Sequence, residues 1–356
     1  MSSEARPPIP LVVGVTGHRD LVPAELPMLR ARVEELFDYL ESQFPDLPLA
    51  ALSALAEGAD RLVARVALER RIPLTAVLPL AAEDYEQDFG SESSLREFRE
   101  LVAAADVIEL ADTTEGEAFV SGPERDERYA AAGAFIATHC QVLVALWDGN
   151  TPGKRGGTAE IVNYRVTGRG PEAAAGQIRP EDLLGDNEND LVYHVACSRQ
   201  QSPGQPGPGL RAGQVNWLTD DPGEPRTAEL PAHYRDIFEH MQAFNRDWIA
   251  HRESIRCNTF SLLEGRKFPP SIRKVDEIFG IADCLANLYQ LRVTYSLRTL
   301  YSLAALMGLA FVLYSDLYPA RPMLWLFLVL FAAGVYVHRQ AERGQWHRRY
   351  LDYRAL

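Results

Sequence analysis

The segment VVGVTGHRDL near the N-terminus places two glycines and a threonine at the end of a run of β-branched residues. Gly14 and Gly17 permit positive φ angles and let a ligand approach the backbone, while Thr16, His18 and Arg19 supply polar side chains beside them. Amides at the start of a following helix can face an anion such as a phosphate. An ordinary turn at a strand end, with Arg19 in solvent, explains this motif equally well.

A second glycine-rich turn lies in VLVALWDGNTPGKRGGTAEIV, residues 142–162. A hydrophobic strand ends there, and Gly156 and Gly157 leave the backbone open before a helix begins. Thr158 can cap that helix, whose first amides offer a phosphate site. Glu160 complements the helix dipole, accepts hydrogen bonds from ribose hydroxyls or acts as a catalytic carboxylate. The residue types and their spacing do not match a Walker A loop.

A third turn of this kind lies in LSALAEGADRLVARVAL, where Glu57, Gly58 and Asp60 follow a strand and precede a helix. Asp60 is either a residue of the first helical turn or a contact to the base or ribose of a ligand. Tyr85 and Phe89 can stack on a base, although packing in the core is the favoured role. The predicted ligand-binding residues are Gly14, Thr16, Gly17, His18, Arg19, Glu57, Gly58, Asp60, Asp148, Gly156, Gly157, Thr158 and Glu160.

The elements that position these turns follow from the hydrophobic pattern between residues 10 and 195. Short apolar runs predict strands at 11–17, 49–55, 74–79, 107–110, 142–147 and 191–196. Amphipathic segments predict helices at 25–43, 58–70, 92–104, 125–139 and 157–166. Such alternation indicates an α/β fold, a Rossmann-like and mainly parallel sheet with helices on both faces. Ligands bind such sheets at the carboxyl ends of the strands, near a topological switch point.

Composition restricts the partners that we expect. The net charge of −13 argues against a nucleic-acid polymer, because neutralising its phosphates needs clustered Lys and Arg. A small nucleotide held by a few local groups is compatible with this charge. The four cysteines are scattered without metal-ligand spacing, so we expect reduced thiols, a cytosolic setting, no metal site and no cofactor.

The C-terminal part changes character. Residues 199–232 are rich in Pro and Gly and predict a linker or long surface loop, and 233–298 predict a helical coupling region. Two nearly uncharged segments, 299–318 and 322–338, favour a two-helix transmembrane hairpin over a buried hairpin, because no other segment could cover them. The predicted domains are therefore 1–198, 199–232, 233–298 and 299–356.

Charged flanks predict the orientation of this hairpin. Arginines precede the first apolar segment and follow the second, and the connecting loop contains only Arg321. The positive-inside rule therefore places both termini and the α/β domain in the cytoplasm. The N-terminus lacks the pattern of a secretory signal peptide. The final YLDYRAL has no capping Gly or Pro, so we expect its helix to continue in a longer protein or a partner.

The motifs GVTGHR and AEGAD, with Arg128 before CQVLVALWDG and GGTAE, resemble the SLOG superfamily over about residues 10–200. Its members are Rossmann-like nucleotide-binding domains related to the Lonely Guy phosphoribohydrolases and to the DNA-uptake protein DprA. In the enzymes an arginine and the motif glutamate cleave an N-glycosidic bond, which implies Arg128 and Glu160 as a catalytic pair. Asp148 and Gly149 stand where the enzymes have Pro-Gly-Gly, and Tyr129 stands where they have Lys, which favours binding over hydrolysis.

FGIADCLANLYQ, the two apolar segments and HRRYLDYRAL resemble the SLATT-type two-helix membrane effectors. This resemblance implies a homo-oligomeric sensor and effector of the bacterial inner membrane, active in antiphage or stress signalling. Its cytosolic domain would bind a nucleotide-derived second messenger and signal to the transmembrane helices. The alternative is a membrane-tethered nucleotide phosphoribohydrolase of Lonely Guy type, which would turn its ligand over. A scaffold that has lost its ligand is a third possibility.

Overall fold

The computed structural model describes residues 9–110, 122–150, 155–168, 190–200, 206–223, 225–258, 270–317 and 321–355. Its contacts divide the chain into two units, Met1–Ala243 and Phe244–Leu356. The first unit contains the sheet, and the second consists of helices.

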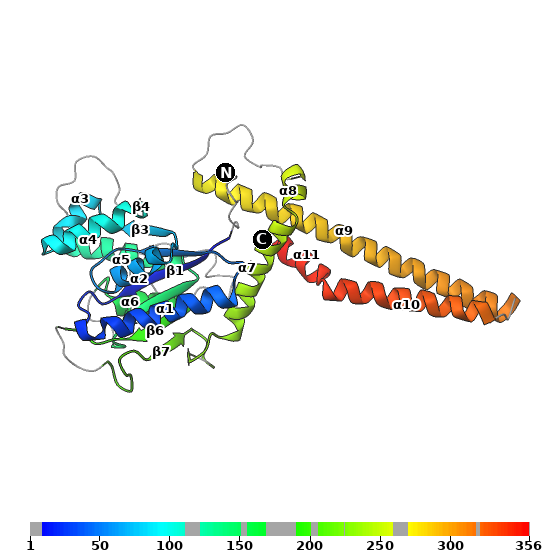
Figure 1. Ribbon diagram of the computed structural model, residues 1–356, viewed down its shortest axis with the longest axis horizontal. Helices are drawn as coiled ribbons and strands as arrows, with labels where there is room; N and C mark the ends of the chain where they lie inside the picture. The colour runs from blue at the N-terminus through cyan, green and yellow to red at the C-terminus, as the bar shows by residue number, and fades with distance from the viewer. Residues whose placement is uncertain are drawn as a thin grey trace. The chain divides into compact units, whose positions relative to one another are not determined.

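Eight strands form one sheet in the order β4-β3-β2-β1-β5-β6-β7-β8 (Figure 1). They are β1 Leu11–Gly17, β2 Leu49–Ser53, β3 Leu74–Leu78, β4 Asp106–Glu109, β5 Val142–Trp147, β6 Val192–Ala196, β7 Val215–Leu218 and β8 Arg226–Thr227. Strands β1 to β6 are parallel, and β7 and β8 are antiparallel. Because β1 pairs with β2 on one side and β5 on the other, the strand order changes direction at β1. The predicted α/β fold class is confirmed.

Helices of the first unit cover both faces of the sheet. They are α1 Leu26–Gln43, α2 Ala59–Glu69, α3 Ala82–Tyr85, α4 Glu92–Ala103, α5 Pro123–Thr138 and α6 Thr158–Thr167, with 3-10 turns at Pro23–Glu25 and Glu86–Asp88. Each of the five predicted helices is present, with ends that agree to within two residues. Helix α7, Ala232–Ala250, begins in this unit and ends in the next.

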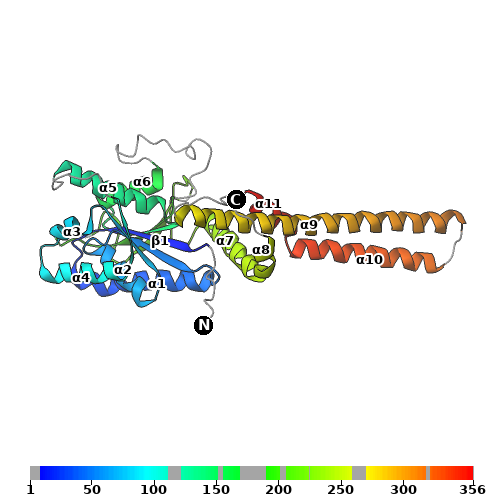
Figure 2. The same cartoon turned by 90° about the horizontal axis from the view of Figure 1, so that it is seen from above.

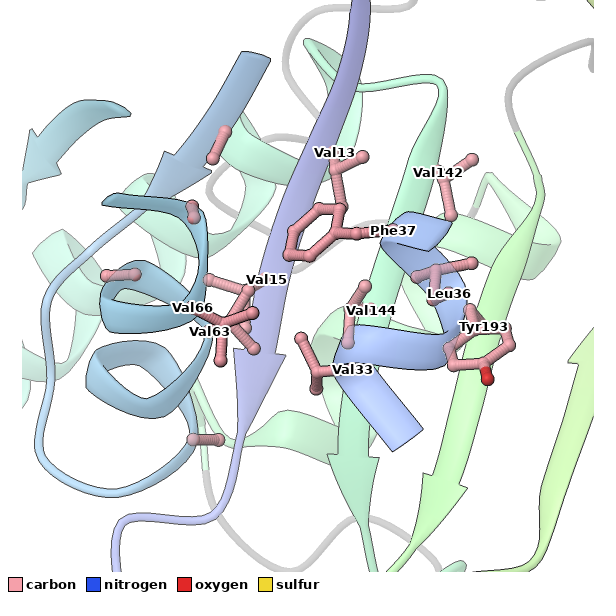
Figure 3. Packing of buried hydrophobic residues seen from close by; sticks show 14 of the residues in the cluster. Val13, Val15, Val33, Leu36, Phe37, Val63, Val66, Val142, Val144 and Tyr193 are labelled. Atoms are coloured by element: carbon pink, nitrogen blue, oxygen red, sulfur yellow. The ribbon is translucent and has the colours of Figure 1, made fainter. Parts of the chain in front are cut away.

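Alternating residues of the central strands supply the two cores. Val142 and Val144 of β5 pack in the same cluster as Phe37 of α1 (Figure 3), whereas Leu143 packs with Ile161 of α6 on the other face. A strand buried on both faces must be apolar at every position, which explains the unbroken run VLVAL. Each fully buried large apolar side chain stabilises the fold by ~1.5–3 kcal/mol.

Residues 199–232 do not form only a linker. Val215–Leu218 adds an antiparallel strand to the edge of β6, and Arg226–Thr227 adds a further short strand. Trp217 is 4% exposed and packs edge-on against Tyr193 at 4.9 Å between ring centroids. The Pro and Gly residues mark the turns around a four-residue strand, so the prediction of a loop was wrong at these positions.

The second unit contains α8 Arg252–Asn258, α9 Pro270–Val312, a π-helical turn Leu313–Leu317, α10 Arg321–Arg343 and α11 Trp346–Ala355. Helices α9 and α10 lie side by side along much of their length (Figures 1 and 2). With 43 residues, α9 is about 65 Å long at ~1.5 Å per residue, roughly twice the ~30 Å hydrocarbon core of a bilayer.

Two helices of this unit are long and apolar enough to cross a membrane, Arg273–Ser315 and Arg321–Ala355. Within the described chain, their most apolar windows are only 11% and 0% buried. Leu309, Phe311, Trp325 and Val329 are each more than half exposed. These side chains need an apolar environment that the described residues do not provide.

A buried polar cluster joins three helices of the same unit. Asp247 of α7 accepts hydrogen bonds from the hydroxyls of Tyr289 on α9, at 2.9 Å, and Tyr353 on α11, at 2.6 Å. Its other carboxylate oxygen accepts from Arg349 of α11 at 2.6 Å. The cluster ties α11, at the C-terminal end of the described chain, to α7 and to the first half of α9.

Candidate functional site

A cavity of about 650 Å³ lies where β1, β2 and β5 end and α6 begins. We call it the switch-point cavity, because β1 and β5 are the strands at which the sheet order changes direction. The predicted ligand-binding residues that line it are Thr16, Gly17, His18, Arg19, Asp60, Asp148, Gly156, Gly157 and Thr158. The structure thus brings together the three glycine-bearing turns.

Two of these turns interlock at the cavity. The His18 amide donates to Leu146 O at 3.0 Å, and the Ala59 amide donates to His18 O at 3.1 Å. A Cβ at Gly17 would lie 2.3 Å from the Cβ of Ala59, and one at Gly58, whose φ is +80°, would lie 2.4 Å from His18 O. These glycines therefore allow the strand ends to approach one another.

Two predicted ligand residues have other structural roles. Gly58 does not line the cavity but permits the turn contact just described. Gly14 is buried inside β1, where a Cβ would lie 2.7 Å from Cys140 Sγ and 2.8 Å from Ile136. Its small size lets α5 and the following turn pack on the sheet. Neither of these two predicted residues lines the switch-point cavity.

His18 and Asp148 form a bonded pair on the cavity wall. The Asp148 amide donates to His18 Nε2 at 3.0 Å, and the Asp148 carboxylate lies 3.2 Å from the same nitrogen. Burial lowers the pKa of His18 against the opposing charge of Asp148. A neutral imidazole can accept the amide proton, so His18 joins β1 to β5 rather than supplying a cation.

Asp60 lies at the buried end of the cavity. It is 5% exposed, and burial raises the pKa of its carboxyl group to about 7, against the opposing charge of Arg19. The Asp60 carboxylate accepts from the Ala56 amide over a long distance, 3.4 Å. A carboxyl group with a pKa near neutrality in a cavity is a common feature of functional sites.

Two tyrosines complete this buried end. Tyr85 is fully buried and Tyr129 partly buried, and neither hydroxyl has a hydrogen-bond partner among the described residues. Their ring centroids are 5.9 Å apart, and the Arg19 guanidinium lies 4.9 Å from the centre of the Tyr129 ring. Burial raises the pKa of Tyr85, so its hydroxyl remains a proton donor. Buried polar groups are rarely left unpaired, so the two hydroxyls mark this end of the cavity as unsatisfied.

The N-terminus of α6 forms the opposite side of the cavity. Gly157 occupies the capping position with extended backbone angles, φ −77° and ψ 159°, and contributes no side-chain cap. Thr158 is the first helical residue, so the expectation that its side chain caps the helix was wrong. The amides of Thr158 and Ala159 begin the helix beside the cavity, where the helix dipole favours an anion.

Glu160 and Arg128 do not line the switch-point cavity. The Glu160 carboxylate turns back and accepts a hydrogen bond from the Gly156 amide. The Arg128 guanidinium lies 3.7 Å from Glu124, one turn earlier on α5. Glu160 therefore stabilises the glycine turn instead of facing a ligand, and the cavity lining does not support the inferred catalytic pair.

Helix α5 lines the cavity with residues other than Arg128. Asp126, Tyr129, Gly133 and Ile136 line it, at the spacing of one helical face. Ala132 also lines the cavity, whereas Arg128 does not. The sequence analysis missed Asp126 and Tyr129, although their spacing from Gly133 could have revealed them.

Cationic residues beyond the predicted set also reach the cavity. Arg155 precedes Gly156, and Arg199 follows β6 and pairs with Asp20 at 3.0 Å. Three arginines and four aspartates line the cavity in total. This mixture does not attract anions in general, so any phosphate must be bound by local geometry. Among the described residues, no three His, Cys, Asp or Glu side chains form a metal-binding group.

No family model matches this sequence. No curated protein is similar to it at a significant level. Two solved structures are similar in fold. DNA processing protein A (DprA) from Streptococcus pneumoniae has 17% identity and a TM-score of 0.33, over 53% of this chain and 51% of that chain. DprA from Helicobacter pylori has 16% identity and a TM-score of 0.27, over 39% and 54%. This chain thus spans about half the length of the structures that it matches.

Both neighbours are DprA proteins, and their similarity to this chain is one of fold alone. They also correct one prediction. The Helicobacter pylori protein binds single-stranded DNA, so the exclusion of nucleic-acid polymers as partners was wrong. The net charge of −13 is a sum over the whole chain and says little about local charge. Four arginines, for example, line a single cavity beside α4.

Proposed function

We propose that the protein is a membrane-anchored sensor whose α/β unit binds a nucleotide-derived messenger in the switch-point cavity. One observation carries this proposal: the cavity joins the N-terminus of α6 to a buried end with unpaired hydroxyls. The helix start suits a phosphate. Tyr85, Tyr129 and Asp60 suit the hydroxyl or amide groups of a ribose or base. A volume of about 650 Å³ is within the usual range for small-molecule sites.

Helix α7 offers a route from the site to the apolar helices. It contributes Tyr234 and Phe238 to the core of the α/β unit and Asp247 to the polar cluster of the helical unit. A ligand that binds one conformation better than another shifts their populations by that difference in affinity. We infer that messenger binding changes the assembly of the apolar helices through α7.

The cellular setting is part of the same proposal. The exposed apolar helices suit a bilayer, and the flanking arginines favour an orientation with both termini in the cytoplasm. The resemblance to SLATT-type effectors implies a homo-oligomer that acts on the inner membrane in stress or antiphage signalling. The alternative, a phosphoribohydrolase, would need Arg128 and Glu160 at the ligand, and neither lines the cavity. We therefore propose binding without turnover.

The test is thermal unfolding of the full chain in detergent micelles with nucleoside monophosphates, ADP-ribose and cyclic oligonucleotides. A ligand at 100 times its dissociation constant stabilises the folded state by ~2.7 kcal/mol, which raises Tm by several degrees. Gly157→Val should abolish the rise, because Val tolerates the backbone angles at this position but blocks the helix amides. Thr167→Val, at the far end of α6, should keep it.

Chromatography of the same mixtures distinguishes binding from turnover. The sensor leaves the nucleotide intact, whereas a phosphoribohydrolase releases a free base. If no ligand on this panel raises Tm, the proposed nucleotide site is wrong. Release of base by the wild-type protein would replace the sensor with the enzyme.

A further inference from the structure

A second cavity, of about 490 Å³, lies beside the switch-point cavity. We call it the arginine cavity, because Arg19, Arg61, Arg65 and Arg96 line it. The side chain of Arg19, on the turn after β1, is common to the linings of both cavities.

Arg61 is the most informative residue of the arginine cavity. It is 3% exposed, and its Nε donates to Leu55 O at 3.1 Å. Its Nη1 donates to Ser94 O at 2.8 Å and to Glu97 at 3.1 Å, but its buried Nη2 has no partner among the described residues. The guanidinium lies 4.4 Å from the centre of the Phe89 ring. Leaving a buried cationic nitrogen without an acceptor is costly, so the folded chain gains stability if an acceptor reaches it.

The remaining charges around this cavity are unequally satisfied. Glu97 accepts from Arg65 at 2.6 Å and from Arg61. Burial alone would raise the pKa of Glu97, but these two hydrogen bonds hold it below the usual value, so the carboxylate is charged. Arg96 forms no ion pair within the described part of the chain. Glu57, one of the predicted ligand residues, lines this cavity rather than the switch-point cavity, and its carboxylate accepts a hydrogen bond from the Ser94 hydroxyl. Four arginines and three glutamates line the cavity, which leaves an excess of one positive charge.

The start of α4 adds backbone donors. Ser91 caps this 12-residue helix by accepting from the Ser94 amide at 3.2 Å. Ser93 and Ser94, in the first turn, line the arginine cavity. A helix start beside unsatisfied guanidinium nitrogen favours a phosphate over a neutral group.

We propose that the arginine cavity binds a second phosphate of the same ligand, so that the messenger is a dinucleotide rather than a mononucleotide. This inference rests on the proposed function of the switch-point cavity. One nucleotide would occupy that cavity, Arg19, which lines both cavities, would contact the ligand between its two nucleotides, and Arg61 and Arg96 would hold the phosphate of the second nucleotide.

The test compares the affinities of mononucleotides and dinucleotides for the full chain in detergent micelles. The probes are AMP, GMP, CMP and UMP, with the linear and cyclic homodinucleotide of each base, titrated by calorimetry. We expect at least one dinucleotide to bind tenfold or more tightly than its mononucleotide. Arg96→Gln should remove that advantage and leave the affinity for the mononucleotide unchanged.

The matched control is Arg99→Gln. Arg99 lies one turn further along α4, pairs with Glu86 at 2.6 Å and does not line the cavity. Arg61→Gln is a second test variant. If this buried substitution prevents folding, Arg96→Gln alone tests the proposal, because Arg96 is exposed. Equal affinities for mononucleotide and dinucleotide, or an advantage that survives in Arg96→Gln, overturn the second site and leave the first intact. Absence of all binding overturns both.

Discussion

Each unit of the chain buries an aspartate among tyrosines and an arginine, but with opposite outcomes. Around Asp247, the hydroxyls of Tyr289 and Tyr353 and the guanidinium of Arg349 all point to the carboxylate. Around Asp60, the nearby tyrosine hydroxyls have no partner among the described residues. The first cluster is complete without a ligand, and the second is not.

This difference separates a structural joint from a binding site. A fully satisfied buried network stabilises one arrangement of the helices that it connects. An unsatisfied one leaves the folded state with unpaired donors that a ligand can use. The environment of Asp60 also raises its pKa to about 7, because the carboxylate lacks the close donors that Asp247 has.

The largest expected effect comes from removing the complete cluster. Asp247→Ala leaves a buried guanidinium and two buried hydroxyls without their acceptor, and should lower the free energy of unfolding by about 3–5 kcal/mol. Denaturant unfolding of the full chain in detergent measures this loss. Glu277→Gln, which removes an exposed 3.7 Å ion pair on α9, is the control and should change little. A similar small change in Asp247→Ala would show that the cluster is not a joint.

The next effect is a pH dependence that belongs to Asp60. The folded-state pKa of Asp60, about 7, lies above its ordinary value of 3.8, so the folded state keeps a proton that the unfolded state loses. The free energy of unfolding therefore falls as pH rises from about 4 to 7. Asn at position 60 does not titrate. The free energy of unfolding of Asp60→Asn, taken relative to that of wild type, should therefore rise by about 2–3 kcal/mol between pH 5 and pH 8. A constant difference between the two proteins across that range would contradict the raised pKa.

A smaller difference in stability is expected between variants that lose one tyrosine hydroxyl from each cluster. Tyr353→Phe removes a hydrogen bond to a charged acceptor and should destabilise the protein by about 1.5 kcal/mol. Tyr85→Phe removes a buried hydroxyl that has no partner, and should leave the stability unchanged or raise it slightly. The same Tyr85→Phe variant should bind the messenger less tightly. If Tyr85→Phe destabilises as much as Tyr353→Phe, the contrast between the clusters fails.

The smallest effect concerns Glu160. Gln at this position still accepts from the Gly156 amide and loses only the charge near the helix start, so Glu160→Gln should cost about 0.3–1 kcal/mol. Ligand affinity measured by calorimetry should stay as in wild type. A loss of affinity comparable to that in Gly157→Val would return Glu160 to the ligand site.

The local hydrophobic pattern was enough to predict the strands β1 to β6 and the helices of the α/β unit. Buried strands such as VLVALW have to be apolar on both faces, and the amphipathic segments between them have to cover those faces. That periodicity also predicted the parallel sheet and the edge at which its glycine turns meet. It failed for Val215–Leu218, because four residues among prolines and glycines are too few to show a period.

The sequence by itself thus determined the sheet, the positions of the three turns and the two exposed apolar helices. Tertiary structure decided which side chains of those turns reach the ligand space. Gly14 and Gly17 look alike in sequence, but helix packing fills the space beside one and a cavity adjoins the other. The Glu160 carboxylate accepts a hydrogen bond from the neighbouring Gly156 amide. Asp126 and Tyr129 line the cavity, whereas the predicted Arg128 does not. Periodicity reports the face of an element, whereas partners and empty space depend on which other elements pack against that face.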